Sequence, residues 1–221
     1  MELNISNLGD SFEHVLSDDN PNKAVAVDEC HLDLVYGLVR SHKPTSVLEI
    51  GVGSGRTTAY LSKALDKNGN LQKLTLVDNW VDWKGDKPEF VKQFEDKVNL
   101  VESDELSFVF EKNKTMYDFI FSDADHWNTQ KWFEHVFFSM LKPGGILIYH
   151  DVSIKSHCPK DAFRFPNLED ILIKCKKYGI SHMHFDRSSS EGELCWRGLL
   201  VIFKSQLRSI VPKDDSIYVL D

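Results

Sequence analysis

The chain has 221 residues, 42% of them apolar, which is enough for one domain with a hydrophobic core of its own. It contains 26 Lys and Arg against 34 Asp and Glu, so its formal net charge is −8. An acidic chain has no general attraction to nucleic acid or to anionic membranes, so we expect neither as a partner.

The spacing of the cysteines and the first residues of the chain indicate in which cellular compartment the protein is expected. Four cysteines are scattered without C-x-x-C spacing, at Cys30, Cys158, Cys175 and Cys195. This pattern argues against a zinc site or a disulfide framework. No basic region followed by an apolar run opens the chain, and no apolar run reaches membrane-spanning length. We therefore expect a cytoplasmic protein with reduced thiols.

The first element that we expect is a helix from Glu29 to about Ser41, which Asp28 can cap. Its apolar stripe has helical spacing and is typical of core packing. The polar residues 1–27 before it form an irregular N-terminal lead. We expect a single domain over 28–205 and a partly apolar C-terminal tail over 206–221.

The chain is organised around the stretch SVLEIGVGSGR, from Ser46 to Arg56. Its apolar start reads as a short buried strand, three glycines follow at alternate positions, and Thr57 to Leu65 reads as a helix. Glycines let the backbone approach a ligand closely, and the start of a helix offers unpaired N–H groups. A strand, a glycine turn and a helix in this order predict a ligand cradle.

A second strand is predicted from Leu71 to Val77, and it ends at Asp78. The spacing fits a βαβ unit, and a carboxylate there can accept hydrogen bonds from both hydroxyls of a ribose. The alternative is an ordinary turn aspartate. In the following loop, Trp80 and Trp83 either wall a ligand pocket or pack the loop onto its own domain.

The remaining elements continue to alternate. The pattern predicts helices over 88–96, 127–141 and 167–178, the last capped by Asn167. It predicts strands over 98–101, 117–121, 146–149, 180–185 and 199–203. Residues 152–166 form a long connection, and Ser188 to Gly192 join the last two strands.

Strands that alternate with helices imply an α/β fold, a doubly wound sheet covered on both faces. We expect a mostly parallel, seven-stranded, Rossmann-like sheet with an antiparallel C-terminal strand. The candidate acids follow the carboxyl ends of strands, where open α/β sheets bind their ligands.

The glycine segment departs from the dinucleotide fingerprint, because its third glycine comes one residue early and Arg56 stands in the place of that glycine. The segment Glu49-Ile-Gly-Val-Gly-Ser-Gly55 resembles motif I of class I S-adenosylmethionine-dependent methyltransferases. The resemblance implies S-adenosylmethionine as cofactor. It implies cofactor contacts from Glu49, Gly51, Gly53, Gly55 and Asp78 and, toward the adenine, from Ser103 and Asp104.

A second block comprises Asp123-Ala-Asp-His126, Leu141-Lys-Pro-Gly-Gly145 and Tyr149-His-Asp-Val152. It resembles the catechol and caffeoyl-coenzyme A O-methyltransferases and their Asp-x-x-His relatives. In the catechol-type enzymes an acid after the fourth strand and two residues after the fifth strand bind a divalent metal. The resemblance places metal ligands at Asp123, His150 and Asp151 and a cofactor-side acid at Asp125. It places His126 where a lysine would help to remove the substrate proton.

Both histidines depart from the family pattern. Mg²⁺ prefers oxygen ligands, whereas His150 would suit Mn²⁺, Fe²⁺ or Zn²⁺ better, so the choice between Mg²⁺ and Mn²⁺ stays open. A metal can lower the pKa of a hydroxyl, and His126 can accept its proton. We therefore expect catalytic roles for Asp123, His126 and His150. The alternative is that both acids cap turns and that His150 simply ends a strand.

The leading hypothesis is O-methylation of a small hydroxylated molecule, and a homodimer is left open. Methylation of a macromolecule is a second hypothesis, although the chain has no Asn-Pro-Pro-Tyr-like or Pro-Cys motif of base methylation. A noncatalytic cofactor-binding protein is a third hypothesis, which stays open because His126 and His150 depart from the family pattern. The sequence does not name the methyl acceptor.

Overall fold

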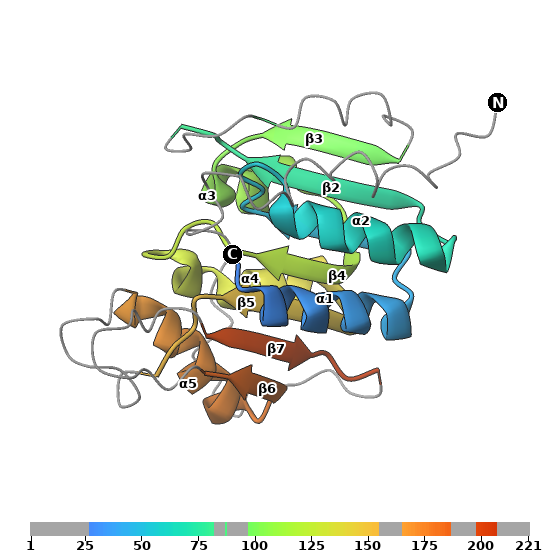
Figure 1. The fold of residues 1–221 in the computed structure, drawn as a ribbon. Helices are drawn as coiled ribbons and strands as arrows, with labels where there is room; N and C mark the ends of the chain where they lie inside the picture. Colours follow the sequence, from blue (N-terminus) through green and yellow to red (C-terminus); the bar gives the residue numbers. More distant parts are fainter. Residues whose placement is uncertain (1–26, 82–86, 88–96, 155–164, 187–197, 207–221) are drawn as a thin grey trace.

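The computed structural model describes residues 27–81, 87, 97–154, 165–186 and 198–206. A seven-stranded sheet with the order β3-β2-β1-β4-β5-β7-β6 forms its centre (Figure 1). The strands are β1 (Ser46–Ile50), β2 (Lys73–Asp78), β3 (Val98–Glu102), β4 (Tyr117–Ser122), β5 (Leu141–His150), β6 (Ser181–Phe185) and β7 (Leu199–Phe203). The first five strands pair in parallel, and β7 is antiparallel to both of its neighbours. The predicted fold class is confirmed.

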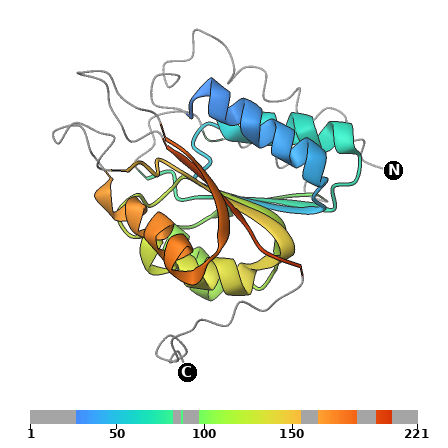
Figure 2. The same ribbon diagram turned by 90° about the horizontal axis from the view of Figure 1, so that it is seen from below.

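Helices cover both faces of the sheet (Figure 2). On one face lie α1 (Glu29–His42) and α2 (Arg56–Asn68). On the other face lie α3 (Glu105–Ser107), α4 (Phe133–His135) and α5 (Glu169–Tyr178). Each face has its own core, and all five residues of β1 are buried between them. This burial on both faces explains why the parallel strands read as almost continuous apolar runs.

The predicted helix over 127–141 is irregular. Its backbone forms a 3₁₀ turn (Thr129–Lys131), α4 and a π-helical turn (Val136–Met140), and the chain enters β5 already at Leu141. The Lys204 ammonium group donates to three carbonyls at this helix end, those of Phe137, Phe138 and Leu141. The expected apolar face is nevertheless buried, because the side-chain pattern and not the exact backbone form determines which residues meet the core.

Two further local predictions need correction. Asn167 does not cap a helix, because Pro166–Leu168 form a 3₁₀ turn before α5 and the Asn167 amide donates to the Trp127 carbonyl instead. Asp28 does occupy the N-cap position of α1, but its side chain makes no capping hydrogen bond. The segment from Glu105 to Glu111, for which we made no prediction, forms α3 and most of a π-helical turn. This turn also includes Lys112, which we expected at the start of a loop.

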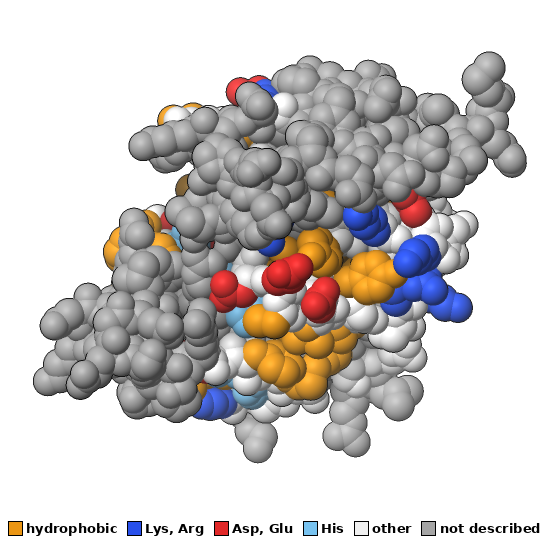
Figure 3. Space-filling model, viewed as in Figure 1, with side chains coloured by type: hydrophobic (Ala, Val, Ile, Leu, Met, Phe, Trp, Pro, Cys, Tyr) orange, Lys and Arg blue, Asp and Glu red, His pale blue; other side chains and the backbone are white. Residues whose placement is uncertain are grey.

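Several predictions lie outside the described residues. These are the helix over 88–96, Trp83, the connection at Ser188 to Gly192, most of the long connection and nearly all of the lead and the tail. Among the helices that are described, none combines the length and apolar character needed to cross a bilayer. On the face that carries α1 and α2, the Lys and Arg side chains lie in small groups among acidic and apolar ones (Figure 3).

Candidate functional site

The glycine turn after β1 requires glycine for two reasons. Gly51, Gly53 and Gly55 have φ angles of +87°, +53° and +93°, which L side chains rarely adopt. In addition, a Cβ on Gly51 would lie 2.1 Å from the backbone oxygen of Asp123. The turn therefore packs directly against the chain that leaves β4, and it brings two candidate functional segments together.

Asp78, at the end of β2, holds this turn in place. One carboxylate oxygen accepts hydrogen bonds from the backbone N–H groups of Val52 and Gly53, both at 2.8 Å. The other accepts from the N–H of Trp80 at 2.8 Å. The Trp80 indole N–H in turn donates to the Gly53 carbonyl at 2.8 Å, so this tryptophan packs the loop onto the turn. A ribose contact of Asp78 would use the remaining lone pairs and stays a prediction.

Glu49 lies fully buried beside the turn and is not among the residues that line the cavity described below. Its carboxylate accepts a hydrogen bond from the Thr58 hydroxyl at 2.7 Å. Burial raises the pKa of Glu49 to about 8, and the negative charges of Asp78 and Asp123 act in the same direction. Glu49 therefore ties β1 to α2, and its predicted cofactor contact stays a prediction.

A cavity of about 590 Å³ opens at the carboxyl ends of the parallel strands. The glycine turn contributes Gly51 and Gly53 to its wall, whereas Gly55 caps α2 behind it. Asp78, Ser103 and Asp104 line the same side of the predicted site. The volume lies within the range of small-molecule sites, and its position at the strand ends is the usual one for this class of sheet.

The other wall of this cavity carries the second predicted group. Asp123, Asp125, His126 and Asp151 line it, whereas His150 lies just behind, with a side chain only 4% exposed. Asp125 also has a local role, because it accepts hydrogen bonds from the backbone of the turn that follows it. The structure thus joins the two blocks of the sequence in one cavity.

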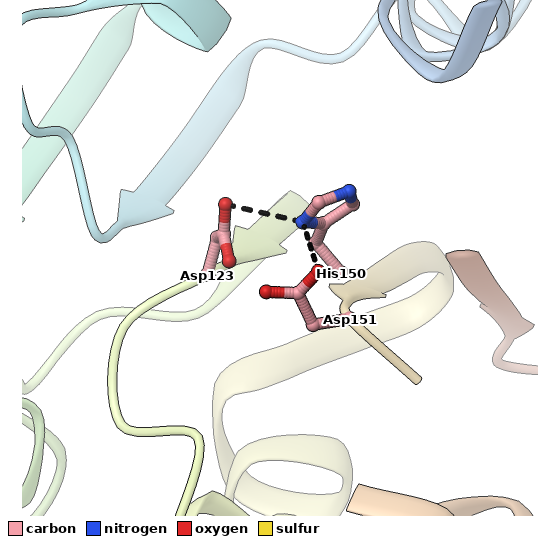
Figure 4. Close-up of side chains that lie close together, drawn as sticks. All are labelled: Asp123, His150 and Asp151. Atoms are coloured by element: carbon pink, nitrogen blue, oxygen red, sulfur yellow. Dashed lines mark ion pairs between the residues drawn. The ribbon is translucent and has the colours of Figure 1, made fainter. Parts of the chain in front are cut away.

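Two carboxylates and two imidazoles form a closed cluster at the ends of β4 and β5. His126 Nε2 lies 3.1 Å from Asp123 Oδ1 and 2.9 Å from Asp151 Oδ2. His150 Nδ1 lies 3.3 Å from Asp123 Oδ2 and 3.2 Å from Asp151 Oδ1 (Figure 4). Each histidine therefore faces both acids, and each acid faces both histidines.

The cluster shifts the pKa values of Asp123 and of both histidines. Burial alone would lower the pKa of His126, but its hydrogen bonds to Asp123 and Asp151 and their charges outweigh burial and raise this pKa to about 10. Burial would likewise lower the pKa of His150, but the negative charges of Asp151 and Asp123 outweigh burial and raise this pKa. Burial opposes ionisation of Asp123, but the two histidines hold the pKa of Asp123 well below its ordinary value. Two protonated imidazoles can thus neutralise two carboxylates.

The same cluster has a donor set suited to a divalent cation. One ligand atom each from Asp123, His150 and Asp151 lie within 4.8 Å of one another. Among the described residues, neither ring nitrogen of the buried His150 has a hydrogen-bond partner, although Nδ1 points between two carboxylates (Figure 4). A nitrogen that is close to two acids but not aligned for hydrogen bonding fits a metal ligand. The nitrogen favours Mn²⁺, Fe²⁺ or Zn²⁺ over Mg²⁺.

Sequence reasoning missed Glu105, at the start of α3, whose hydrogen bonds hold in place the side of the cavity that carries the cluster. Its buried carboxylate accepts hydrogen bonds from the Thr129 hydroxyl at 2.5 Å, the Trp132 indole at 2.9 Å and the Asp125 backbone at 3.2 Å. Burial raises the pKa of Glu105, while these hydrogen bonds oppose that shift. The only signal in the sequence was its place beside a predicted strand end.

An aromatic contact fixes the orientation of His126. The ring of Phe165 stacks on the His126 imidazole, with ring centres 4.2 Å apart and planes 18° apart. The half-exposed Trp127 meets the same phenylalanine edge-on at 5.6 Å. The candidate base is therefore held by two carboxylates on one side and by an apolar ring on its face.

Residues 48–152, from β1 to just past β5, match the model of a methyltransferase domain family. No curated protein sequence matches the chain. The family match and the sheet order together define a methyltransferase domain. The chain thus carries a methyltransferase domain over these residues, in agreement with the resemblance of its motifs to class I S-adenosylmethionine-dependent methyltransferases.

Solved structures with the same fold include three from different organisms. An O-methyltransferase from Bacillus cereus in complex with SAH is 19% identical, covering 88% of this chain and 91% of its own, with a TM-score of 0.61. The O-methyltransferase TomG from Streptomyces achromogenes, involved in tomaymycin synthesis and solved with SAM, is 14% identical with coverages of 93% and 91% and a TM-score of 0.61. The SAH-bound methyltransferase PaMTH1 from Podospora anserina is 14% identical with coverages of 91% and 88% and a TM-score of 0.61. At these identities the likeness establishes the fold.

Proposed function

We propose that this methyltransferase transfers a methyl group to a hydroxyl oxygen of a small molecule. One observation carries the proposal: a single cavity has the glycine turn at one side and the acid–histidine cluster at the other. A cofactor bound at the turn would have its reactive end beside groups that can bind and deprotonate a hydroxyl. Two of the structural neighbours described above are named as O-methyltransferases, which agrees with this choice of acceptor atom.

The cofactor would lie along the strand ends. S-adenosylmethionine carries its methyl group on a cationic sulfonium, which negative side chains attract. Gly51 and Gly53 let the backbone approach the ligand, Asp78 keeps the turn rigid, and Ser103 and Asp104 line the side proposed for the adenine. Rigid positioning matters because methyl transfer requires the acceptor oxygen in line with the sulfur–carbon bond.

The cluster would prepare the acceptor. Asp123, His150 and Asp151 would hold a divalent cation, which supplies charge to acidify a bound hydroxyl. Without a cation the hydrogen bonds and charges of Asp123 and Asp151 keep His126 protonated, because they outweigh its burial and raise its pKa to about 10. A cation held by the two carboxylates would offset these charges, and a neutral His126, which lines the cavity, would then be the candidate to take up the hydroxyl proton. Asp123 and Asp151 would also orient the acceptor beside the methyl group.

The test is methyl transfer from tritiated S-adenosylmethionine to catechol, with and without excess EDTA. We expect EDTA to remove activity and Mn²⁺ to restore it. Asp151→Asn should lower turnover far more than affinity for S-adenosylhomocysteine, because the proposed cofactor anchors lie on other strands. Full activity in EDTA would refute the metal, and normal turnover of a folded His126→Ala variant would refute the base.

The acceptor experiment also decides between the alternatives. Tight binding of S-adenosylhomocysteine without transfer to a panel of hydroxylated compounds would favour a noncatalytic cofactor-binding protein. Transfer to a protein or nucleic acid alone would favour a macromolecular acceptor, although the described Lys and Arg side chains form no continuous basic surface on the face in Figure 3. The cytoplasmic location and the homodimer stay predictions.

A further inference from the structure

Arg56 occupies a position that helix stability does not explain. It is the first residue of α2, directly after Gly55, and the first turn of this helix contains no acidic residue. The start of a helix carries a partial positive charge, so a cation there is unfavourable unless an anion is close. Positions that break a local rule of this kind are often functional.

The guanidinium group of Arg56 also lacks acceptors. Within the described residues, its Nε and Nη1 atoms are buried and have no hydrogen-bond partner. Buried N–H donors of a charged group are costly when they stay unpaired. Arg56 lines the same cavity as the glycine turn, so a ligand in that cavity can meet its side chain. A turn of the side chain toward the ligand would give Nε and Nη1 the acceptors that they lack.

The charges around the cavity are strongly unequal. Among the described residues that line it, Arg56 is the one Lys or Arg side chain, and six side chains are acidic. These acids are Asp78, Asp104, Glu105, Asp123, Asp125 and Asp151. An anionic group is repelled from the strand ends and attracted to Arg56, where the free N–H groups of the first turn of α2 add to the attraction. A guanidinium presents nearly parallel N–H donors in two pairs, Nε with Nη2 and Nη1 with Nη2, and either pair matches the two oxygens of a carboxylate.

We propose that Arg56 is the binding residue for a carboxylate at the α2 end of the cavity. This inference rests on the proposed function only in that the cavity holds a cofactor and an acceptor. Two ligands can bring a carboxylate: the cofactor through its amino-acid end, or an acceptor that carries a carboxylate beside its hydroxyl. In both cases Arg56 fixes the direction in which the ligand lies, because among the described lining residues it is the one Lys or Arg side chain, whereas the histidine of the cluster is already paired with two carboxylates.

Calorimetric titration distinguishes the two ligands without any turnover. S-adenosylhomocysteine and 5′-methylthioadenosine share the nucleoside and the thioether, but the second has no carboxylate. If the cofactor supplies the carboxylate, Arg56→Met should bind S-adenosylhomocysteine about ten- to a hundredfold more weakly and 5′-methylthioadenosine unchanged. Arg56→Lys keeps the charge but lacks the two parallel N–H donors, so its affinity for S-adenosylhomocysteine should lie between those of the wild type and Arg56→Met. If Arg56→Met does not fold, Arg56→Lys serves as the test variant. Lys63→Met removes a cation from the same helix away from the cavity and should change neither affinity.

The second arm tests the acceptor. If the acceptor supplies the carboxylate, Arg56→Met should weaken 3,4-dihydroxybenzoate about tenfold or more on the S-adenosylhomocysteine-loaded protein, and it should leave catechol unchanged. Unchanged affinity for all four ligands, or equal losses with and without a carboxylate, would overturn the inference. Arg56-dependent binding in a protein that methylates no small molecule would refute the proposed function and leave the inference standing.

Discussion

Replacing Gly51 by alanine tests how the two halves of the site are joined. A Cβ at this position would lie 2.1 Å from the backbone oxygen of Asp123, 2.4 Å from its carbonyl carbon and 2.9 Å from the nitrogen of Ala124. Contacts below 3 Å with backbone cannot be relieved by turning a side chain. The φ of +87° adds about 1–2 kcal/mol of strain for an L residue. We therefore expect Gly51→Ala to lower the free energy of unfolding by at least about 3–4 kcal/mol.

Two other glycines separate the contributions. Gly69 ends α2 with φ +68°, and a Cβ added there would have nothing within 4 Å, so Gly69→Ala should cost only the strain of about 1–2 kcal/mol. Gly37 lies inside α1 and has equally open surroundings, so Gly37→Ala should stabilise the protein by about 0.5–1 kcal/mol. The difference between the Gly51 and Gly69 variants measures the clash alone.

The assay is urea-induced unfolding of the three variants and the wild type under one set of conditions, combined with titration of S-adenosylhomocysteine. Since the clash displaces Asp123, the Gly51 variant should also lose cofactor affinity, whereas the other two should keep it. A Gly51→Ala variant that costs no more than Gly69→Ala would show that the turn and the chain after β4 are not packed as described.

Three further predictions concern buried or braced carboxylates. Glu105→Ala leaves the hydroxyl of Thr129 and the indole N–H of Trp132 buried without their acceptor, so urea unfolding should show a loss of about 2–4 kcal/mol. Because burial raises the pKa of Glu49, this side chain ionises at lower pH in the unfolded chain than in the folded protein. The free energy of unfolding of the wild type should therefore fall as pH rises from about 4.5 toward 8, by at most about 1.4 kcal/mol per pH unit. Glu49→Gln should remove this slope, and the same pH dependence in both proteins would contradict the burial argument. Hydrogen bonds from Thr45, Lys142 and Ser46 outweigh the burial of Asp118 and lower its pKa. Asp118→Asn should therefore lower the free energy of unfolding by about 1 kcal/mol at neutral pH. This difference should vanish as pH falls below the ordinary carboxyl pKa of 3.8.

The sheet and the position of the site could be predicted from the sequence because both depend on local patterns. Apolar runs between turn residues marked the strands, and polar residues such as Asp78 and Asp123 stood directly after them. Since parallel strands end at one edge, these side chains had to come near one another. The glycine turn follows β1 and the acid–histidine residues follow β4 and β5, and these strands are neighbours in the sheet. The order of the strands therefore explains why the two motif blocks meet at one cavity.

The contacts within the site could not be predicted in the same way. Asp78 binds the backbone of the glycine turn because Val52 and Gly53 present their N–H groups to it, which depends on φ angles that no pattern encodes. Glu105 accepts hydrogen bonds from Thr129 and Trp132, which lie 24 and 27 residues further along the chain, so no local sequence pattern predicts these contacts. The cluster of two acids and two histidines likewise depends on the left-handed backbone of Asp151, with φ +61°.

The proposed function requires that one cavity brings the cofactor and a metal-assisted acceptor site together. A crystal structure with S-adenosylhomocysteine and Mn²⁺, measured at the manganese absorption edge, tests this most directly. We expect the cofactor along Gly51, Gly53 and Asp78, with its sulfur toward the cluster, and an anomalous peak between Asp123, His150 and Asp151. Cofactor bound away from the glycine turn, or a cluster that stays free of manganese at saturating concentration, would contradict it.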